Sequence, residues 1–331
     1  HNPFRVSYGA SVTRQAFWLR LAGDVVWGEG TIPPYYGVDT KEMTAVWESA
    51  ARSLEPFPDD PSAISAWVGD EGPAPARAAL DLALHDRIGK QTNKPLYELL
   101  GLPKPEPAAT SFTIGIDTPE AMANAAAAVP GFPIIKIKLG SDDDAARLAA
   151  IRRERPDVKL YVDANAAWSV DEAVAQLARI MPFGLEMVEQ PVARDDFAGM
   201  AAVQAACAIP VVADESVQTT EDLEKLAAGG VQGINLKLMK VGGLAPAVKL
   251  LRRGRELGLR IMLGCMVETS LGVTAIAHLA GMADWLDLDA PLLVSNDPFD
   301  GVIIDGHARL HLPDRPGIGV LKGIEKELRF G

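Results

Sequence analysis

Residues 134–140 read IIKIKLG, and four similar runs follow: LYVDAN at 160–165, LEMVEQP at 185–191, PVVADES at 210–216 and GINLKLMKVGG at 233–243. Each run is short and apolar, and each ends near a charged side chain. From Lys138 the steps to Asp163, Glu189, Asp214 and Lys237 are 25, 26, 25 and 23 residues. This interval fits one strand, one helix and two loops of a (β/α)₈ barrel, which gathers the carboxyl ends of its strands at one mouth.

The same alternation extends on both sides of these runs. Continuous apolar runs are typical of parallel strands that are buried on both faces. Thr118 with Pro119, the pair Ser169 and Glu172, and Gly258 provide helix start and stop signals in the intervals. We therefore predict an α/β fold with a modified TIM-like barrel of the (β/α)₇β type over 106–291. Its expected strands are 109–116, 134–139, 159–164, 185–190, 209–214, 233–238, 260–266 and 284–288.

Residues 1–105 follow a different pattern. Alternation over 16–21, a turn at Gly23-Asp24 and the apolar residues 25–27 predict a β-hairpin. Pro75 opens a segment with apolar residues at helical spacing. We expect residues 1–105 to form an α+β capping domain, which the tail over 292–331 rejoins.

Composition narrows the class of protein. The chain has 331 residues, 48% of them apolar, and a net charge of -12. The negative charge argues against nucleic acid and anionic membranes as partners, and no apolar run is long enough for a membrane span. Two isolated cysteines without metal spacing predict buried free thiols in a reducing compartment such as the cytoplasm. No signal peptide is visible, although the chain begins at His1, which leaves open a preceding segment.

Three carboxylates close consecutive predicted strands. Asp163, Glu189 and Asp214 would lie side by side at the barrel mouth, where their negative charges repel one another. Burial of such a group is costly unless the pKa values rise or a cation lies between the side chains. A set of oxygen ligands without His or thiol favours a hard ion. We predict one Mg²⁺ per subunit, with Mn²⁺ as the alternative.

Lysines flank the three carboxylates. Lys136 and Lys138 point to the same side of their strand, and Lys237 ends a strand across the mouth. An ammonium beside a dication and another ammonium should have its pKa lowered from about 10.4 toward about 7 to 8, where it can act as a base. A metal with two opposed bases indicates removal of a proton α to a carboxylate, giving an enediolate. Return of the proton to the opposite face makes a racemase or epimerase, whereas loss of a leaving group makes a lyase or cycloisomerase.

These motifs resemble the enolase superfamily, muconate-lactonizing subgroup, along almost the whole chain. The matching stretches are ALDLALHDRIGK (79–90), PLYELLG (95–101), KIKLG, VDAN, VEQP, ADES and NLKLMKVGG. The resemblance implies metal ligation by Asp163, Glu189 and Asp214, acid and base roles for Lys138 and Lys237, and contact of Lys136 with the substrate carboxylate. Thr113 and Met266 are expected to contact the substrate as well. No histidine ends a predicted strand, which argues against a Lys/His pair of bases.

The eighth predicted strand suggests the substrate. The run LDLDAP (286–291) resembles the DxD signature of dipeptide epimerases, in which Asp287 and Asp289 would hold a free α-ammonium group. We therefore expect a Mg²⁺-dependent epimerase that inverts the C-terminal residue of an L-Ala-L-Xaa dipeptide. The alternatives are muconate cycloisomerase, o-succinylbenzoate synthase or N-acylamino acid racemase. A non-catalytic metal-dependent binding barrel is the alternative of another class, and the intact Lys138 and Lys237 argue against it.

The preferred side chain of the dipeptide is less well defined by the sequence. Relatives that act on L-Ala-L-Glu use an arginine in an N-terminal cap loop, and that place falls near Gly9 in this chain, with Arg5 and Arg14 the nearest arginines. This departure argues against specificity for L-Ala-L-Glu. The loop 32–37 (IPPYYG) offers aromatic surface to an apolar side chain instead. Relatives are often oligomeric, so the resemblance also implies a homo-oligomer.

Overall fold

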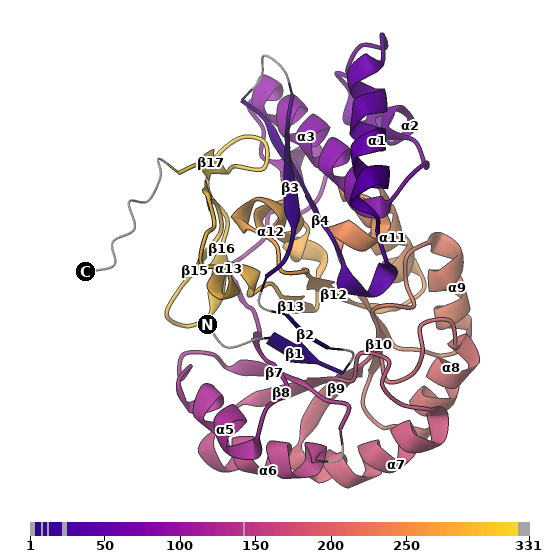
Figure 1. Cartoon of the computed structure of the whole chain (residues 1–331), viewed down its shortest axis with the longest axis vertical. Helices are drawn as coiled ribbons and strands as arrows, with labels where there is room; N and C mark the ends of the chain where they lie inside the picture. Colours follow the sequence, from indigo (N-terminus) through magenta and orange to yellow (C-terminus); the bar gives the residue numbers. More distant parts are fainter. Residues whose placement is uncertain (1–3, 8, 12, 22–24, 142, 324–331) are drawn as a thin grey trace.

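The computed structural model describes residues 4–7, 9–11, 13–21, 25–141 and 143–323. Its central feature is a sheet of eight strands in sequential order, in which each neighbouring pair is parallel (Figure 1). The backbone N–H of Ser111 donates to the carbonyl oxygen of Leu286 (3.0 Å), which links the two edge strands. The strands are β6 (Phe112–Ile114), β7 (Ile134–Lys138), β8 (Lys159–Asp163), β9 (Leu185–Glu189), β10 (Val211–Ala213), β11 (Gly233–Leu236), β12 (Arg260–Gly264) and β13 (Trp285–Asp287).

Helices follow the strands and cover the outside of the sheet (Figure 1). The strands are buried on both faces, and one large apolar core fills the space between sheet and helices. The predicted α/β barrel is therefore confirmed. The helices are α5 (Pro119–Ala127), α6 (Asp144–Glu154), α7 (Val170–Ile180), α8 (Phe197–Ala206), α9 (Thr220–Ala228), α11 (Leu244–Glu256) and α12 (Ser270–Ala277), with the short α10 (Leu238–Val241) and α13 (Ala290–Leu293).

Helix ends follow the local signals in the sequence. Thr118 accepts a hydrogen bond from the backbone N–H of Ala121 and caps α5. Ser169 and Glu172 form the expected capping box at the start of α7. Gly258 has a φ of 76° just beyond α11, a conformation that favours glycine after a helix. These ends are set locally, so they could be predicted without knowledge of the fold.

The expected strand over 109–116 is wrong in one respect, because two strands occupy this segment. Only β6 (Phe112–Ile114) belongs to the barrel. The preceding β5 (Ala108–Ala109) pairs antiparallel with β16 (Arg309–His311) near the end of the chain. Thr110 and Ser111 separate the two strands in the sequence, but nothing local shows that the strands pair with different partners.

The first hundred residues form a hairpin and helices beside the barrel mouth (Figure 1). β3 (Ala16–Arg20) pairs antiparallel with β4 (Trp27–Thr31), so the hairpin is present, although its second strand begins at Trp27 rather than Val25. The predicted turn at Gly23-Asp24 lies outside the described residues. The helices are α1 (Thr40–Arg52), α2 (Ile64–Val68), α3 (Ala74–Thr92), in which Pro75 occupies the first turn, and α4 (Leu96–Leu99), and a short pair of strands, β1 (Phe4–Val6) and β2 (Gly9–Ser11), precedes them.

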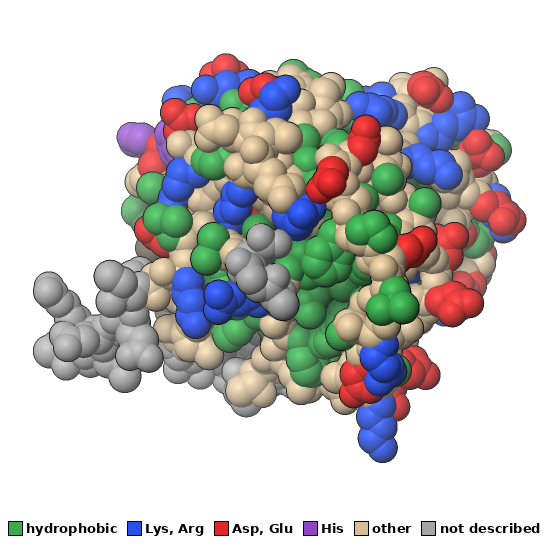
Figure 2. Space-filling model, turned by 90° about the horizontal axis from the view of Figure 1, so that it is seen from above, with side chains coloured by type: hydrophobic (Ala, Val, Ile, Leu, Met, Phe, Trp, Pro, Cys, Tyr) green, Lys and Arg blue, Asp and Glu red, His purple; other side chains and the backbone are tan. Residues whose placement is uncertain are grey.

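Close packing of β4 on α3 explains a glycine in the hairpin. A Cβ at Gly28 would collide with the carbonyl oxygen of Ala79, so only glycine fits here. Seen from the side of α1 and α3, the molecule shows a central group of apolar side chains with charged side chains around it (Figure 2). Beneath this face lies a second apolar cluster, which includes Leu21, Val26, Ile64 and Leu84.

The chain after the barrel returns to the first hundred residues. β14 (Phe299–Asp300) pairs with β17 (Leu321–Lys322), and β15 (Ile303–Ile304) pairs with β16. The ring of Phe299 contacts Trp18 and Trp27 of the hairpin, each with a centroid distance of 5.6 Å. The domain boundaries near residues 105 and 291 stay a prediction. None of the described helices is long and apolar enough to cross a membrane.

Candidate active site

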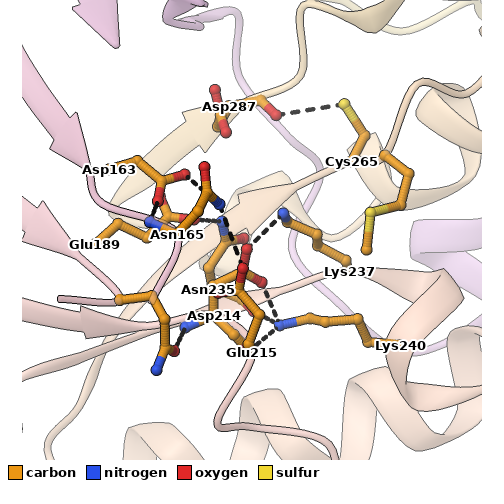
Figure 3. Close-up of polar contacts among 12 residues, drawn as sticks. Asp163, Asn165, Glu189, Asp214, Glu215, Asn235, Lys237, Lys240, Cys265 and Asp287 are labelled. Carbon is orange, nitrogen blue, oxygen red and sulfur yellow. Dashed lines mark hydrogen bonds and ion pairs between the residues drawn. The ribbon is translucent and has the colours of Figure 1, made fainter. Parts of the chain in front are cut away.

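Strand register brings the charged side chains of the predicted site to one level. Lys138 lies directly opposite Asp163 on the neighbouring strand, and Asp163 lies opposite Glu189 on the next one. Asp214 follows β10 immediately, and Lys237 follows β11. Figure 3 shows the side chains of Asp163, Glu189, Asp214 and Lys237 close together at these strand ends. The regular interval in the sequence therefore correctly predicted that these residues lie on neighbouring strand ends.

A cavity lies at this end of the barrel. Thr113, Lys136, Lys138, Asp214, Lys237, Met266, Asp287 and Asp289 are among the residues that line it. Asp163 and Glu189 are completely buried and are not part of its wall. The site residues named from the sequence are thus brought together, with two carboxylates beneath the cavity.

Ion pairs tie the lysines to the carboxylates. Lys138 Nζ lies 2.6 Å from Asp163 Oδ2. Lys136 Nζ lies 3.3 Å from Asp163 Oδ2, 2.7 Å from Glu189 Oε2 and 2.6 Å from Asp287 Oδ2. Lys237 Nζ lies 2.7 Å from Asp214 Oδ2. Ammonium groups therefore lie between carboxylates that would otherwise repel one another.

This arrangement separates the pKa values of the three carboxylates. Burial raises the pKa of Glu189 to about 8, and the charge of Asp163 adds to the rise. For Asp214 and Asp163 burial acts in the same direction, but the nearby lysine charges outweigh it and hold both pKa values below the usual range. Glu189 is thus the carboxylate whose negative charge is least well compensated.

The expected lowering of a lysine pKa applies to a site that holds a dication, and it stays a prediction. Burial lowers the pKa of Lys237, but the charges of Asp214 and Glu189 outweigh it and raise the pKa well above its ordinary value. The pKa of Lys136 is also raised, because Asp287 and Glu189 outweigh the effect of burial. The expectation assumed a dication beside the lysine, whereas carboxylates surround these ammonium groups.

The three carboxylates suit a hard metal ion by their chemistry. Among the described residues, no three His, Cys, Asp or Glu side chains are arranged so that they could hold a metal ion as they stand. Lysine ammonium groups hold the oxygens instead. Glu189 Oε2 is buried, with Lys136 Nζ at 2.7 Å as its ion-pair partner. The raised pKa of Glu189 indicates that this ammonium does not offset burial and the neighbouring carboxylate charges, and three carboxylates gathered here fit an oxygen-coordinated cation.

Asp287 and Asp289 have different surroundings although both line the cavity. Asp287 accepts a hydrogen bond from Ser111 Oγ (2.6 Å) and pairs with Lys136. Asp289 accepts from the backbone N–H of Thr113 (2.7 Å). Burial and the charge of Asp287 raise the pKa of Asp289 to about 6. Asp289 forms no ion pair with a described residue, so a bound cation would offset its charge.

Sequence reasoning did not single out Lys240 and Asn235. Lys240 Nζ lies 2.6 Å from Asp214 Oδ1 and 2.9 Å from the carbonyl oxygen of Asn235. Asn235 Nδ2 donates to Glu189 Oε1 (2.9 Å). The spacing of Lys237 and Lys240 could have indicated this second lysine. Residues three apart are neighbours at the start of a helix, and both ammonium groups reach Asp214.

Residues from the first hundred also line the cavity. The loop after β4 contributes Ile32, Pro33, Tyr35 and Tyr36, in agreement with the aromatic surface that the sequence predicted for this loop. Arg14 lines it as well, while Arg5 is exposed and is not part of the wall. The cavity therefore does contain an arginine, but it is Arg14 and not a residue at the expected position near Gly9.

The chain resembles known proteins over most of its length. The family model described as "Enolase C-terminal domain-like" matches residues 120–321. An L-Ala-D/L-amino acid epimerase of Maribacter sp. is 37% identical over 304 residues, covering 91% of this chain and 89% of that protein. An L-Ala-D/L-Glu epimerase of Bacteroides thetaiotaomicron is 38% identical over 311 residues, covering 92% and 80%.

A solved structure agrees with these relatives. A dipeptide epimerase from Cytophaga hutchinsonii, complexed with Mg and the dipeptide D-Ala-L-Val, has a TM-score of 0.90 and 27% identity, and the match covers 98% of this chain and 93% of that one. The family model covers more than half of the chain, and the curated relatives cover more than nine tenths of it. The chain therefore belongs to the enolase superfamily, among the relatives of the dipeptide epimerases.

Proposed function

We propose that this protein is a Mg²⁺-dependent dipeptide epimerase, an isomerase that inverts the Cα of the C-terminal residue of an L-Ala-L-Xaa dipeptide. The observation that carries the proposal is the pair of lysines on facing sides of one cavity. Lys138 is on the second barrel strand and Lys237 follows the sixth, so four positions of an eight-stranded barrel separate them. The relatives named above support the reaction and the dipeptide class of substrate.

The metal ligands in this proposal are Asp163, Glu189 and Asp214. Their all-oxygen donor set and the raised pKa of Glu189 suit one Mg²⁺ per subunit, with Mn²⁺ as the alternative. The Cytophaga hutchinsonii relative, whose structure contains Mg, supports this choice. When bound, the ion would stabilise the negative charge that develops on the substrate carboxylate as the α-proton leaves.

Lys138 and Lys237 carry the proton transfer in our proposal. One lysine, in its neutral form, takes the α-proton from one face of the substrate carbon, and the protonated lysine on the other side supplies a proton to the opposite face. Lys136 is on the same strand as Lys138 and lines the cavity, where its ammonium can hold the substrate carboxylate. Both lysines of the acid and base pair must reach the same carbon atom, which a cavity with facing walls allows.

Asp287 and Asp289 would bind the free α-ammonium group of the dipeptide. Asp289 forms no ion pair with a described residue, and its raised pKa of about 6 should fall when an ammonium group lies beside it. Thr113 holds Asp289 through its backbone N–H, and Met266, which follows the neighbouring barrel strand β12, also lines the cavity. Muconate, succinylbenzoate precursors and N-acylamino acids lack a free ammonium, so this pair of acids favours a dipeptide over those alternatives.

The decisive experiment is α-proton exchange in D₂O with Mg²⁺, followed by NMR and polarimetry on a panel of L-Ala-L-Xaa dipeptides. We expect deuterium at the Cα of the C-terminal residue together with loss of optical rotation. Asp287→Asn combined with Asp289→Asn should abolish turnover of dipeptides and spare N-acylamino acids. Unchanged dipeptide turnover in that double variant would contradict the proposal, and activity on acylamino acids alone would favour the racemase alternative.

The panel also decides the side-chain preference. Arg14 in the cavity wall provides a positive charge for an acidic side chain, whereas Ile32, Pro33, Tyr35 and Tyr36 provide apolar and aromatic surface. L-Ala-L-Glu and L-Ala-L-Leu therefore belong in the same panel. The placement of Arg14 weakens the expectation, based on the sequence, that L-Ala-L-Glu is a poor substrate.

We further propose that the protein works in the cytoplasm. Cys207 and Cys265 are free cysteines, as a reducing compartment would keep them. A homo-oligomer remains an expectation from the family resemblance, and size-exclusion chromatography with light scattering would test it.

A further inference from the structure

A buried glutamate of the hairpin joins the two walls of the cavity. Glu29 in β4 is completely buried. Three residues beyond it begins the cap wall, which we define as Ile32, Pro33, Tyr35 and Tyr36. The barrel wall, defined as Cys265, Met266 and Val267, directly follows β12. Both walls line the cavity, and no role in the proposed reaction accounts for a buried carboxylate between their ends.

The carboxylate of Glu29 accepts four hydrogen bonds that connect these walls. Oε1 accepts from Thr31 Oγ1 (2.7 Å) and from the backbone N–H of Thr269 (3.0 Å). Oε2 accepts from the Thr269 hydroxyl and from the backbone N–H of Gly272 (3.1 Å). Thr31 directly precedes the cap wall, and Thr269 follows the barrel wall after a single intervening residue, Glu268. The four bonds therefore hold the residues next to the cap wall and next to the barrel wall against the same carboxylate.

All four partners are donors, so the site requires a side chain that accepts at both oxygens. An amide can accept at one oxygen only and would direct an N–H group at the backbone N–H of Gly272. Thr31 adds a second link, because its backbone N–H donates to Met239 Sδ in α10 (3.4 Å). The hairpin is thus bonded to the segments that follow β11 and β12. The cap wall directly after the hairpin therefore has little freedom to shift.

We infer that Glu29 is a positioning residue that sets the width of the cavity between the cap wall and the barrel wall, and thereby selects the C-terminal side chain of the dipeptide. This inference rests on the proposed function. Glu29 does not line the cavity itself, so it acts through the two walls. Loss of its bonds should move the walls relative to each other without moving Lys138, whose strand lies on another side of the barrel.

The test is the conservative variant Glu29→Gln, assayed by α-proton exchange with L-Ala-L-Ala, L-Ala-L-Leu and L-Ala-L-Phe. We expect the ratio of kcat/KM between the smallest and the largest side chain to change by about tenfold, mainly through KM, because wall displacements below 1 Å already alter rates by such factors. For the best substrate, kcat should stay within about threefold of the wild type, since the lysines keep their places.

Two further variants keep the inference testable if Glu29→Gln folds poorly. Thr31→Val removes one donor while keeping the shape of the side chain, and it should change selectivity in the same direction by a smaller factor. Asp81→Asn is the matched control. Asp81 is also a buried acid of the first hundred residues, and it accepts from the backbone N–H of Leu244 (2.6 Å) at the start of α11. It does not line the cavity. It should lower Tm and leave selectivity unchanged.

The outcomes separate the two proposals. A wild-type protein that exchanges none of these dipeptides would overturn the proposed function itself. An active wild type whose selectivity is the same in Glu29→Gln and Thr31→Val, whatever their Tm, would overturn the role of Glu29 alone. A parallel change of selectivity in Asp81→Asn would show a general loosening of the fold and would overturn it as well.

Discussion

At the scale of single residues, carboxylates of the same kind have very different pKa values in this site. Asp163 and Asp214 have lysine partners that keep their pKa values low, whereas Glu189 has a pKa of about 8 and Glu268 reaches about 8. The difference comes from the balance between burial and nearby positive charge, not from the type of side chain. Residue identity alone therefore does not define the charge of this site.

Replacing Lys138 or Lys237 singly should leave variants that exchange the α-proton of different stereoisomers. In Lys138→Ala or Lys237→Ala, we expect epimerisation to fall by about 10³-fold or more, because one of the two proton-transfer groups is lost. Each variant should still exchange the α-proton of the one stereoisomer that the remaining lysine faces. NMR in D₂O with separate L,L and L,D dipeptides measures this. Equal residual exchange of both stereoisomers in both variants would contradict a mechanism with two facing bases.

Glu268 should make stability depend on pH. It accepts a hydrogen bond from the backbone N–H of Met266 (2.8 Å), and burial together with the charge of Glu29 raises its pKa to about 8. Since its unfolded value is near 4.5, the folded state holds an extra proton between these two values, and stability falls as the pH rises through this window. Glu268→Gln cannot titrate and still accepts the Met266 bond. Its Tm should fall less between pH 6 and pH 9 than that of the wild type, by calorimetry; parallel curves would contradict the assignment.

At the scale of elements, strand ends and helix starts have different roles. The residues at the strand ends carry the chemistry, and the helices that follow begin with local capping signals such as the box of Ser169 and Glu172. Substitution Ser169→Ala removes an acceptor for the first turn of α7 and should cost about 1 kcal/mol. For a chain of this size that corresponds to a loss of about 2–4 °C in Tm. Thr219→Ala at the equivalent box of α9 is the matched control and should behave alike. Loss of epimerase activity in either variant would show that the caps are not independent of the site.

At the scale of the whole molecule, the end of the chain ties the hairpin to the barrel. Phe299 is 7% exposed and contacts both Trp18 and Trp27, and β16 pairs with β5 directly before the first barrel strand. Phe299→Ala should therefore destabilise the protein by about 3 kcal/mol through the cavity it leaves. Because these contacts join the parts, we expect a single calorimetric transition in both proteins. Two separate transitions in the wild type would contradict this coupling.

The sequence predicted the barrel and the members of the site because both follow from a repeated interval. Equal steps between Lys138, Asp163, Glu189, Asp214 and Lys237 leave few arrangements other than consecutive strand ends. Other features depended on contacts between distant segments and left no local signal. The split of 109–116 into two strands, the position of Arg14 in the cavity wall and the four donors around Glu29 are of this kind.

Local patterns in the chain were enough to indicate the fold class, the caps of α5 and α7, and which charged side chains meet, because hydrophobic period and helix capping act over a few neighbouring residues. The pKa shifts of the buried groups and the shape of the cavity arise only in the folded arrangement. The raised pKa of Lys237 shows why: a pKa depends on burial and on all charges within a few ångströms. Those neighbours come from strands about 25 residues apart and from the hairpin, and only folding brings them together.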